Sequence, residues 1–450
     1  MDYRTEHDTM GEVRVPASAL YGAQTQRAVE NFPISQMRFP RAFIRALGLI
    51  KSAAAKVNGR LEQLPADLAA AIEQAAEEVV AGQYDDQFVV DIFQTGSGTS
   101  TNMNANEVIG HLAKAHPNDH VNRGQSSNDV IPSAIHIAGA LLANEELLPA
   151  MEGLQASLRK KADEFKNVIK IGRTHLQDAV PMLLGQEFSG YAEQVEHCIG
   201  RVRVALEGLD ELPLGGTAVG TRLNAIPGFA GAVISEIRAR TGLPFREATN
   251  HFEAQASKDA VSFLSGALKT YAVALTKIAN DIRWLASGPR SGLGEIKLPD
   301  TQPGSSIMPG KVNPVIAESL LMACAQVIGY DATITWCCAA GNFELNVMMP
   351  VMAYDLLESI SLLASSSRNF DIRLVQGIEA DVDRASGYVE QSLAMCTVLA
   401  PVIGYEKAAA IAKEAYHSGR TVREVARETS GIPEGRLNEL LDPRSQTGHS

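Results

Sequence analysis

The sequence predicts a mainly α protein, and three observations lead to this. Of the 450 residues, 45% are hydrophobic but only 6% are aromatic, so the core must consist of small and aliphatic side chains that suit close-packed helices. Several long stretches place apolar residues at the steps of three and four that are typical of a buried helix face. Strands and helices do not alternate, and no repeat of fixed period is present. The length allows two or three domains.

The N-terminal part, residues 1–126, is expected to be a mixed, mostly helical domain. Its first 40 residues are irregular, with strand-like pieces around 11–15. Helices are expected at 41–58, 66–81 and 101–115, the last of them stopped by Pro117. The boundary is placed at Ser126, because Ser-Ser-Asn-Asp is a typical start of a helix.

Residues 127–380 are expected to form a central bundle of long helices. The predicted helices are 128–165, kinked or broken at Pro149, and 183–209, 313–339 and 351–366. The clearest is 249–287, whose apolar residues recur with helical spacing from Phe252 to Leu285. A continuous helix there would be roughly 55 Å long and should pack against other subunits. A small helical domain, 381–450, should follow, with a frayed polar end at 443–450.

Composition excludes several classes of partner. The net charge is −12, from 40 basic and 52 acidic residues without a Lys/Arg cluster, which argues against nucleic acid and anionic membranes. No apolar stretch approaches the length of a membrane span, and the polar start is not a signal peptide, so a cytoplasmic location is expected. The cysteines are odd in number, lack Cys-x-x-Cys spacing and should be free thiols; they are Cys198, Cys324, Cys337, Cys338 and Cys396. No metal or other cofactor is expected.

One loop concentrates polar groups that could act on an anion. Residues 304–314 contain Ser305, Ser306, Lys311 and Asn313 among glycines and prolines. Asn313 is a good N-cap and Pro314 a good first helical residue, so the loop should lead into a helix N-terminus that favours an anion. Taken alone, the composition fits an ordinary mobile surface loop as well.

Further polar blocks occur at 94–104, 125–129, 172–178 and 341–346. The first contains Ser97-Gly98-Thr99 before a predicted helix, an arrangement that can cradle an anion. It lacks the Gly-Lys-Ser/Thr ending of a nucleotide-binding loop. Together the blocks offer short polar donors that suit a small dicarboxylate; these are Ser126, Ser127, Asn128 and Thr174.

These segments, in this order, resemble the fumarase/aspartase superfamily, and within it the class II fumarate hydratase family. The resemblance implies a homotetramer in which each subunit gives five helices to a 20-helix core, with active sites where three chains meet. It also implies reversible hydration of fumarate to (S)-malate in the citric acid cycle, by general acid/base catalysis through an aci-carboxylate intermediate.

The resemblance assigns roles to individual residues. Ser305 would abstract the proton, and Lys311 and Asn313 would hold a substrate carboxylate. His175 would handle a proton through a water molecule, paired with Glu318. Ser306 and Val312 join the blocks above as substrate contacts.

A second, peripheral dicarboxylate site is implied at His116, Pro117, Asn118 and Asp119. A helix stop followed by a turn explains these four residues equally well, so the sequence leaves both interpretations open.

Two alternatives to a hydratase are considered. Aspartate ammonia-lyases resemble this chain but typically carry Gln at the position of His175 and often Thr at that of Ser127, and glycine before Lys311 is the fumarase habit. A non-catalytic structural protein on this scaffold would be expected to lose its polar constellation. Here Ser305, His175 and Glu318 are all retained together with Lys311 and Asn313.

Overall fold

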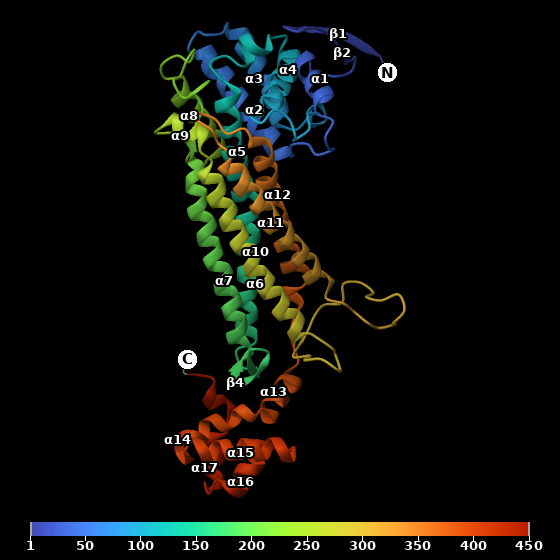
Figure 1. The fold of residues 1–450 in the computed structure, drawn as a ribbon, viewed down its shortest axis with the longest axis vertical. Helices are drawn as coiled ribbons and strands as arrows, with labels where there is room; N and C mark the ends of the chain where they lie inside the picture. The colour runs from blue at the N-terminus through green and yellow to red at the C-terminus, as the bar shows by residue number, and fades with distance from the viewer. Residues whose placement is uncertain (1, 449–450) are drawn as a thin grey trace. The chain divides into compact units, whose positions relative to one another are not determined.

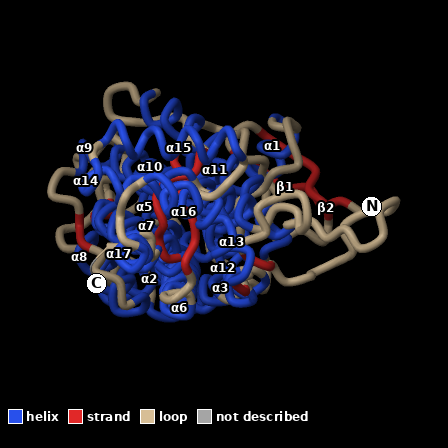
Figure 2. The backbone as a smooth tube through the Cα atoms, turned by 90° about the horizontal axis from the view of Figure 1, so that it is seen from below, coloured by secondary structure: helices blue, strands red, loops and turns tan. Residues whose placement is uncertain are grey.

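The computed structural model describes residues 2–448, and helices make up most of this part of the chain (Figures 1 and 2). The prediction of a mainly α protein is therefore confirmed. The helices before the middle of the chain are α1 (Ala23–Asn31), α2 (Arg41–Arg60), α3 (Ala66–Val80), α4 (Thr99–Ala113), α5 (Ser127–Leu142), α6 (Leu148–Glu164) and α7 (Leu184–Leu206). The later helices are α8 (Phe229–Thr241), α9 (His251–Ala256), α10 (Asp259–Leu285), α11 (Val315–Ala339), α12 (Met349–Arg373), α13 (Val382–Gln391), α14 (Ala400–Ile403), α15 (Tyr405–Ser418), α16 (Val422–Thr429) and α17 (Glu434–Leu440).

The strands of the described residues form four two-stranded pairs. The antiparallel pairs are β1 (Tyr3–Asp8) with β2 (Gly11–Pro16), β3 (Ile169–Thr174) with β4 (Gln177–Leu183), and β7 (Ile296–Lys297) with β8 (Glu379–Ala380). The parallel pair joins β5 (Glu211–Leu212) and β6 (Arg246–Glu247). Separate two-stranded pairs cannot form a core sheet, so the core lies between helices.

The chain divides into two compact units. Unit 1 comprises Met1–Pro149, Cys198–Ala272 and Ala323–Ser365, and unit 2 comprises Ala150–His197, Val273–Met322 and Ser366–Ser450. The three sequential domains expected from the sequence, 1–126, 127–380 and 381–450, stay a prediction.

The expected continuous helix 249–287 is wrong, because the chain breaks between α9 and α10. Ser257 is extended, with φ −81° and ψ 151°. The ammonium of Lys258 donates to the carbonyl oxygens of Ala254, Gln255 and Ser257 at 3.1, 2.8 and 2.7 Å. It thereby satisfies acceptors that the end of α9 leaves open. The remaining helix α10 has 27 residues, which corresponds to about 40 Å.

The predicted helix 128–165 is helical throughout 127–164, and its irregularity is a π-helical turn just before Pro149. α5 ends at Leu142, a π-helical turn spans Ala143–Leu147, and α6 begins at Leu148. Pro149 follows this turn by two residues inside the helical stretch, so the irregular hydrogen bonding occurs next to the residue that lacks an N–H group.

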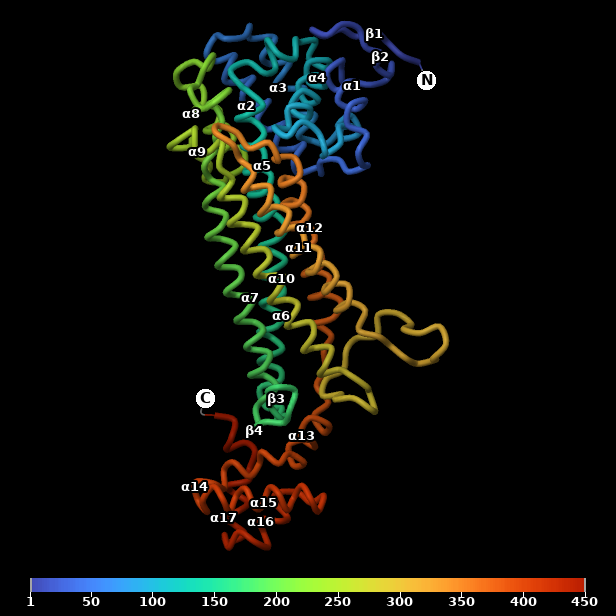
Figure 3. The backbone as a smooth tube through the Cα atoms, viewed as in Figure 1, coloured from blue at the N-terminus to red at the C-terminus, as the bar shows by residue number. Residues whose placement is uncertain are grey.

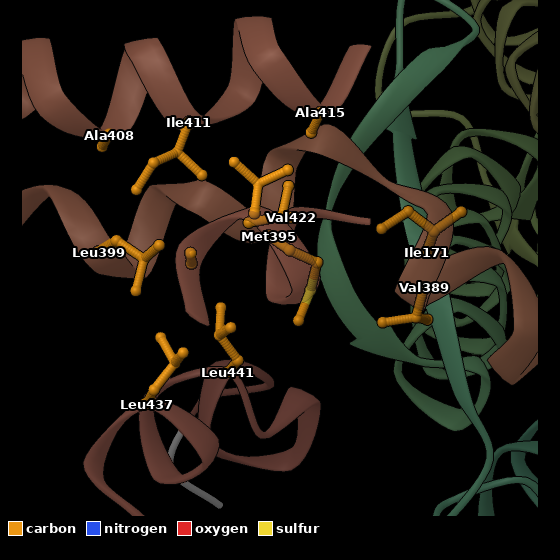
Figure 4. Packing of buried hydrophobic residues seen from close by; sticks show 12 residues of the cluster. Ile171, Val389, Met395, Leu399, Ala408, Ile411, Ala415, Val422, Leu437 and Leu441 are labelled. Atoms are coloured by element: carbon orange, nitrogen blue, oxygen red, sulfur yellow. The ribbon is translucent and has the colours of Figure 1, made fainter. Parts of the chain in front are cut away.

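In each unit, side-chain hydrogen bonds link neighbouring helices. In unit 1, Ser265 and Lys269 of α10 both donate to the carboxylate of Asp331 on α11, at 2.8 and 2.6 Å. In unit 2, the hydroxyl of Tyr191 on α7 donates to Asp281 on α10 at 3.1 Å. The C-terminal helices enclose a small apolar core of their own, whose side chains, including Leu399, Ile411 and Val422, converge (Figure 4).

Helix α11 has an unusual surface. By length and composition alone it could cross a membrane, although the sequence analysis expects no such stretch. Buried helices of water-soluble proteins pass the same test. Only 28% of its apolar window is buried within the chain, so most of that face has no partner in the single chain.

The five cysteines are free, as expected. Cys198, Cys324 and Cys337 are buried, and Cys338 and Cys396 are partly buried. At the C-terminus, Pro443–Gln446 forms a short 3-10 turn, and the expectation of fraying at 449–450 falls outside the described residues.

Candidate functional site

The loop with Ser305 is part of a long connection between α10 and α11 in unit 2, which leaves the helices and returns (Figure 3). Asn313 and Pro314 were expected to begin the helix, but α11 begins at Val315. The Asn313 amide instead donates to the carbonyl oxygen of Gly304 at 2.8 Å. A Cβ at Gly304 would overlap the carbonyl oxygen of Lys311, so glycine is required where the two ends of the loop meet.

Ser305 accepts two hydrogen bonds from the backbone of its own loop. Its Oγ accepts hydrogen bonds from the backbone N–H groups of Met308 at 3.1 Å and Ile307 at 3.4 Å. Donors aimed at an oxygen stabilise its deprotonated form more than its neutral form. The residue is half-buried, which leaves the hydroxyl reachable from solvent.

A cavity of about 1000 Å³ opens beside this loop within unit 2. Lys311, Asn313 and Glu318 line it, together with Arg283 and Lys297. The Lys311 ammonium is exposed and makes no ion pair or hydrogen bond within residues 2–448. Three residues expected to act on one substrate therefore border a common cavity. The Lys311 ammonium is unpaired in the described part of the chain and so is available to bind an anionic ligand there.

His175 lies at the tip of the β3–β4 hairpin, a position that the sequence analysis did not foresee. Thr174 pairs with Gln177, and the two turn residues His175 and Leu176 have φ values of 57° and 59°. Such a turn normally uses Asn-Gly, because positive φ strains other residues. A histidine and a leucine there indicate that the side chains matter more than local backbone preference. Both are exposed, and so is Thr174.

A buried ion-pair cluster holds the base of this hairpin. Arg173 donates to both carboxylate oxygens of Glu295 at 2.9 and 3.1 Å, and Glu295 is fully buried. Lys170 lies 3.5 Å from Glu295 and 2.8 Å from Glu187. Two cations and two carboxylates thus balance, as buried charges must. The hairpin that carries His175 is thereby fixed to unit 2.

The expected pair of His175 and Glu318 is not formed within the chain. No hydrogen bond or ion pair joins them in the described range 2–448, although both belong to unit 2. The pairing therefore stays a prediction.

The Ser97-Gly98-Thr99 loop lies in unit 1 and is tightly packed. Gly98 has φ 73° and immediately precedes α4. A Cβ there would lie 2.9 Å from the side chain of Ile131. The hydroxyls of Ser97 and Thr99 are hydrogen-bonded to each other at 2.8 Å. Two hydroxyls thus lie at a helix N-terminus, and the expected anion cradle stays a prediction.

The Ser126–Asn128 segment begins α5 with a complete capping box. Ser126 Oγ accepts from Asn128 N at 3.2 Å, and Asp129 accepts from Ser126 N at 2.9 Å. The other carboxylate oxygen of Asp129 accepts from the N–H groups of Gly215 and Thr217 at 3.0 and 2.9 Å. Burial raises the pKa of Asp129 to about 6, and these N–H groups oppose the rise. The hydrogen bonds of Asp129 therefore hold the Ser126–Asn128 segment in place.

The residues of the expected second dicarboxylate site form an exposed turn. His116 Nδ1 accepts from Asp119 N at 3.1 Å and so caps the π-helical turn Pro117–Val121. Both interpretations of His116–Asp119 given above fit this geometry, and the second site stays a prediction.

Sequence reasoning missed the buried residues that are hydrogen-bonded to Ser127 and to the loop before it. Lys51 of α2 is fully buried and donates to Asn122 Oδ1 at 3.0 Å and to Gln125 Oε1 at 2.9 Å. Asn102 of α4 donates to Asn122 Oδ1 at 3.2 Å and to Ser127 Oγ at 3.0 Å. A lysine inside an apolar helical stretch was the signal that could have identified this network.

The side chains of residues 2–448 contain no group of three or more His, Cys, Asp or Glu that could hold a metal ion. The functional side chains described above are of the types that serve as general acid/base groups and anion-binding donors.

Comparisons with known proteins agree with one another over the whole chain. The family model described as lyase matches residues 11–329, and the model described as fumarase C C-terminus matches residues 395–448. The chain is 55% identical over 449 residues to a class II fumarate hydratase of Mycobacterium tuberculosis, covering 98% of this chain and 95% of the relative. It is 50% identical over 460 residues to the class II fumarate hydratase of Ralstonia nicotianae, covering 100% of both.

Solved structures resemble it equally closely. A class II fumarase from Schistosoma mansoni superposes with a TM-score of 0.97 at 39% identity, covering 99% of both chains. A fumarate lyase:delta crystallin from Brucella melitensis, bound to cobalt, superposes with a TM-score of 0.95 at 45% identity, covering 100% of both.

Proposed function

Since the chain belongs to the class II fumarate hydratase family, whose reaction is the reversible hydration of fumarate to malate, we propose that the residues described above carry out that reaction. Removal of water from malate begins with loss of a proton from the carbon next to a carboxylate. The resulting carbanion is an aci-carboxylate, and hydroxide then leaves with a proton from an acid. Hydration follows the same steps in reverse.

Ser305 is the proposed base, and the two N–H donors on its Oγ are the observation that carries this assignment. A serine hydroxyl is a poor base unless its alkoxide is stabilised. Two backbone N–H groups and the unpaired ammonium of Lys311 six residues later in the same loop provide that stabilisation. The same ammonium can then oppose the charge that develops on the aci-carboxylate.

The remaining groups divide between anchoring and proton transfer. Lys311, Asn313, Ser306 and Val312 are proposed to hold one carboxylate. The Ser97–Thr99 loop, the Ser126–Asn128 segment and Thr174 supply donors for the rest of the substrate. His175 is proposed to exchange a proton through a water molecule, with Glu318 of another copy fixing its ring.

We infer a homotetramer with shared active sites from exposed apolar surface. Trp336 and Met322 of α11 are 78% and 68% exposed, and Phe263 and Trp284 of α10 are also exposed. Side chains of this kind rarely remain uncovered on long helices. Light scattering should give four copies, and a monomer would contradict the arrangement.

Complementation tests whether sites are shared. Ser305→Ala and His175→Asn chains, each inactive alone, should regain part of the activity when they are refolded together. Recovery requires that the two residues of one site come from different chains, and complete failure to recover would place them in one chain.

A direct assay distinguishes the hydratase from its alternatives. Loss of the fumarate ultraviolet absorption should follow addition of enzyme to fumarate alone. Release of fumarate from aspartate would instead support an ammonia-lyase, and inactivity with both substrates would support a structural protein. We further place the reaction in the citric acid cycle and the protein in the cytoplasm, which cell fractionation can test.

A further inference from the structure

A buried chain of hydrogen bonds leads from Lys51 to a hydroxyl of the proposed site. It runs from the Lys51 ammonium to Asn122 Oδ1, from the Asn102 amide to the same oxygen, and from that amide to Ser127 Oγ, at 3.0, 3.2 and 3.0 Å. Lys51 is 0% and Asn102 1% exposed, while Ser127 is half-buried and reachable. All four residues belong to unit 1.

The chemistry of the chain gives it one direction. Burial lowers the pKa of Lys51 to about 7, but the charged and the neutral nitrogen both carry hydrogens for the side-chain oxygens of Asn122 and Gln125. Two amide oxygens cannot bond to each other, so Asn102 must face Asn122 with its NH₂ group. The second hydrogen of that NH₂ group then points to Ser127 Oγ.

Ser127 is consequently left with a free hydroxyl proton. Its Oγ accepts from Asn102, and this is its one hydrogen bond within residues 2–448. A hydroxyl whose lone pair is occupied by a donor must direct its own O–H elsewhere. The half-buried Ser127 can therefore donate to a carboxylate without first giving up another hydrogen bond.

The opposite direction would not satisfy more of the buried atoms. Asn106 also donates to Asn122 Oδ1, at 3.1 Å. In the observed arrangement Asn102 Oδ1 and Asn106 Oδ1 are buried with no hydrogen-bond partner among the described residues. Reversing the amides would only place NH₂ groups in those two positions. It would also turn Asn122 Oδ1 toward the backbone carbonyl oxygen of Gln125, which accepts from the Asn122 NH₂ group at 3.2 Å. Two groups therefore hold the network in its observed sense: the Lys51 nitrogen, which donates to Asn122 Oδ1, and the Gln125 carbonyl, which can only accept.

We infer that Lys51 is a positioning residue that, together with the Gln125 carbonyl, holds the direction of the Asn122–Asn102–Ser127 network, so that Ser127 presents its hydroxyl proton to a substrate carboxylate. The inference rests on the proposed role of Ser127 in binding the dicarboxylate. Lys51 itself does not contact the substrate. It acts through the amides of Asn122 and Asn102 on the Ser127 hydroxyl, which contacts the substrate.

A double-mutant cycle on substrate affinity tests the inference in the full-length enzyme. Ser127→Ala should raise KM roughly 10-fold, the effect of losing one hydrogen bond to a charged group. Lys51→Met keeps the length of the side chain but removes the donor, and should raise KM by a similar factor. In the Ser127→Ala background, Lys51→Met should change KM by less than about 2-fold, because its target is already absent.

A second buried lysine serves as the matched control. Lys258 is also in unit 1 and 2% exposed, and its ammonium donates only to backbone carbonyls at the end of α9. Lys258→Met should have the same effect on KM with and without Ser127. A general effect of losing a buried lysine would make the two lysine variants behave alike.

The outcomes separate the two proposals. An unchanged KM in Ser127→Ala would overturn the role of Ser127 itself. A raised KM in Ser127→Ala combined with an independent, multiplicative effect of Lys51→Met would overturn the directional network while leaving Ser127 as a ligand. If Lys51→Met does not fold, Asn102→Leu gives the same cycle, since it removes the amide that bonds Ser127; multiplicative effects there would again overturn the inference.

Discussion

The two sets of proposed substrate contacts differ in how the chain supports them. In unit 1, the loop at Ser97–Thr99 is crowded, and a Cβ added at Gly96 would overlap the carbonyl oxygen of Val347. In unit 2, a Cβ added at Gly310, one residue before Lys311, would meet nothing within 4 Å. Crowding fixes the donors of unit 1 before substrate arrives. The Ser305 loop is held by a few hydrogen bonds of its own.

The difference suggests a division of work. Rigid donors contribute to affinity because they lose little freedom on binding. A lightly held loop that carries the base and a cation can adjust around the substrate, at the cost of being ordered when it binds. We therefore expect substitutions in unit 1 to act on stability and KM, and substitutions in the loop to act on kcat.

The largest effect should come from Ser305→Ala. Loss of a positioned proton-transfer group lowers kcat by about 10²–10⁴-fold, while KM should change little because the base acts mainly in the transition state. Steady-state kinetics with malate measure both. Ser306→Ala is the control, and it should act mainly on KM. A Ser305→Ala enzyme with most of its kcat would move the base to His175 and its water.

Glycine substitutions test the contrast in packing directly. Gly96→Ala should lower the free energy of unfolding by about 3 kcal/mol or more, because the methyl group has no space. Gly310→Ala should cost only about 1 kcal/mol, the strain of a left-handed backbone at φ 83°. Urea unfolding followed by circular dichroism measures both. Equal destabilisation would remove the basis of the comparison.

Acid should weaken unit 1 through His136 of α5, which is 7% exposed. Its Nδ1 lies 2.8 Å from the carbonyl oxygen of Glu211, and burial, assisted by the charge of Lys258, lowers its pKa from 6.5 to about 4. The unfolded chain therefore binds the additional proton between these values, and stability falls as pH decreases from 6.5 to 4. The full loss is about 3 kcal/mol.

His136→Asn keeps a donor for Glu211 but cannot titrate. Urea midpoints at pH 6.5 and pH 4 should differ less in this variant than in the native chain. His417→Asn, at an exposed position of α15, is the control and should leave the pH dependence unchanged. An unaltered acid loss in His136→Asn would show that another group causes it.

Metal removal should have the smallest effect. The described side chains offer no cluster of metal ligands, and the proposed chemistry uses only acid/base groups and hydrogen-bond donors. Dialysis of the enzyme against EDTA should leave kcat unchanged. Activity that is lost and then restored by iron would require a different mechanism.

Periodicity and short motifs predicted much of this molecule. The helical class, most helix ranges and the family followed from apolar spacing and from the polar blocks. The break at Ser257 did not, because apolar spacing continues across it and only Lys258, by capping three carbonyls, shows where α9 ends. The hairpin under His175 was missed because His-Leu is an improbable turn. The Lys51 network was missed because its members are far apart in the sequence.

The exposed apolar window of α11 has a consequence for how the protein forms. If that face is covered only by other copies, folding and assembly are one equilibrium, and the apparent stability depends on protein concentration. Dilution should then lower the unfolding midpoint. A newly made chain would also expose this apolar surface until it assembles with other copies, so slow assembly would favour aggregation.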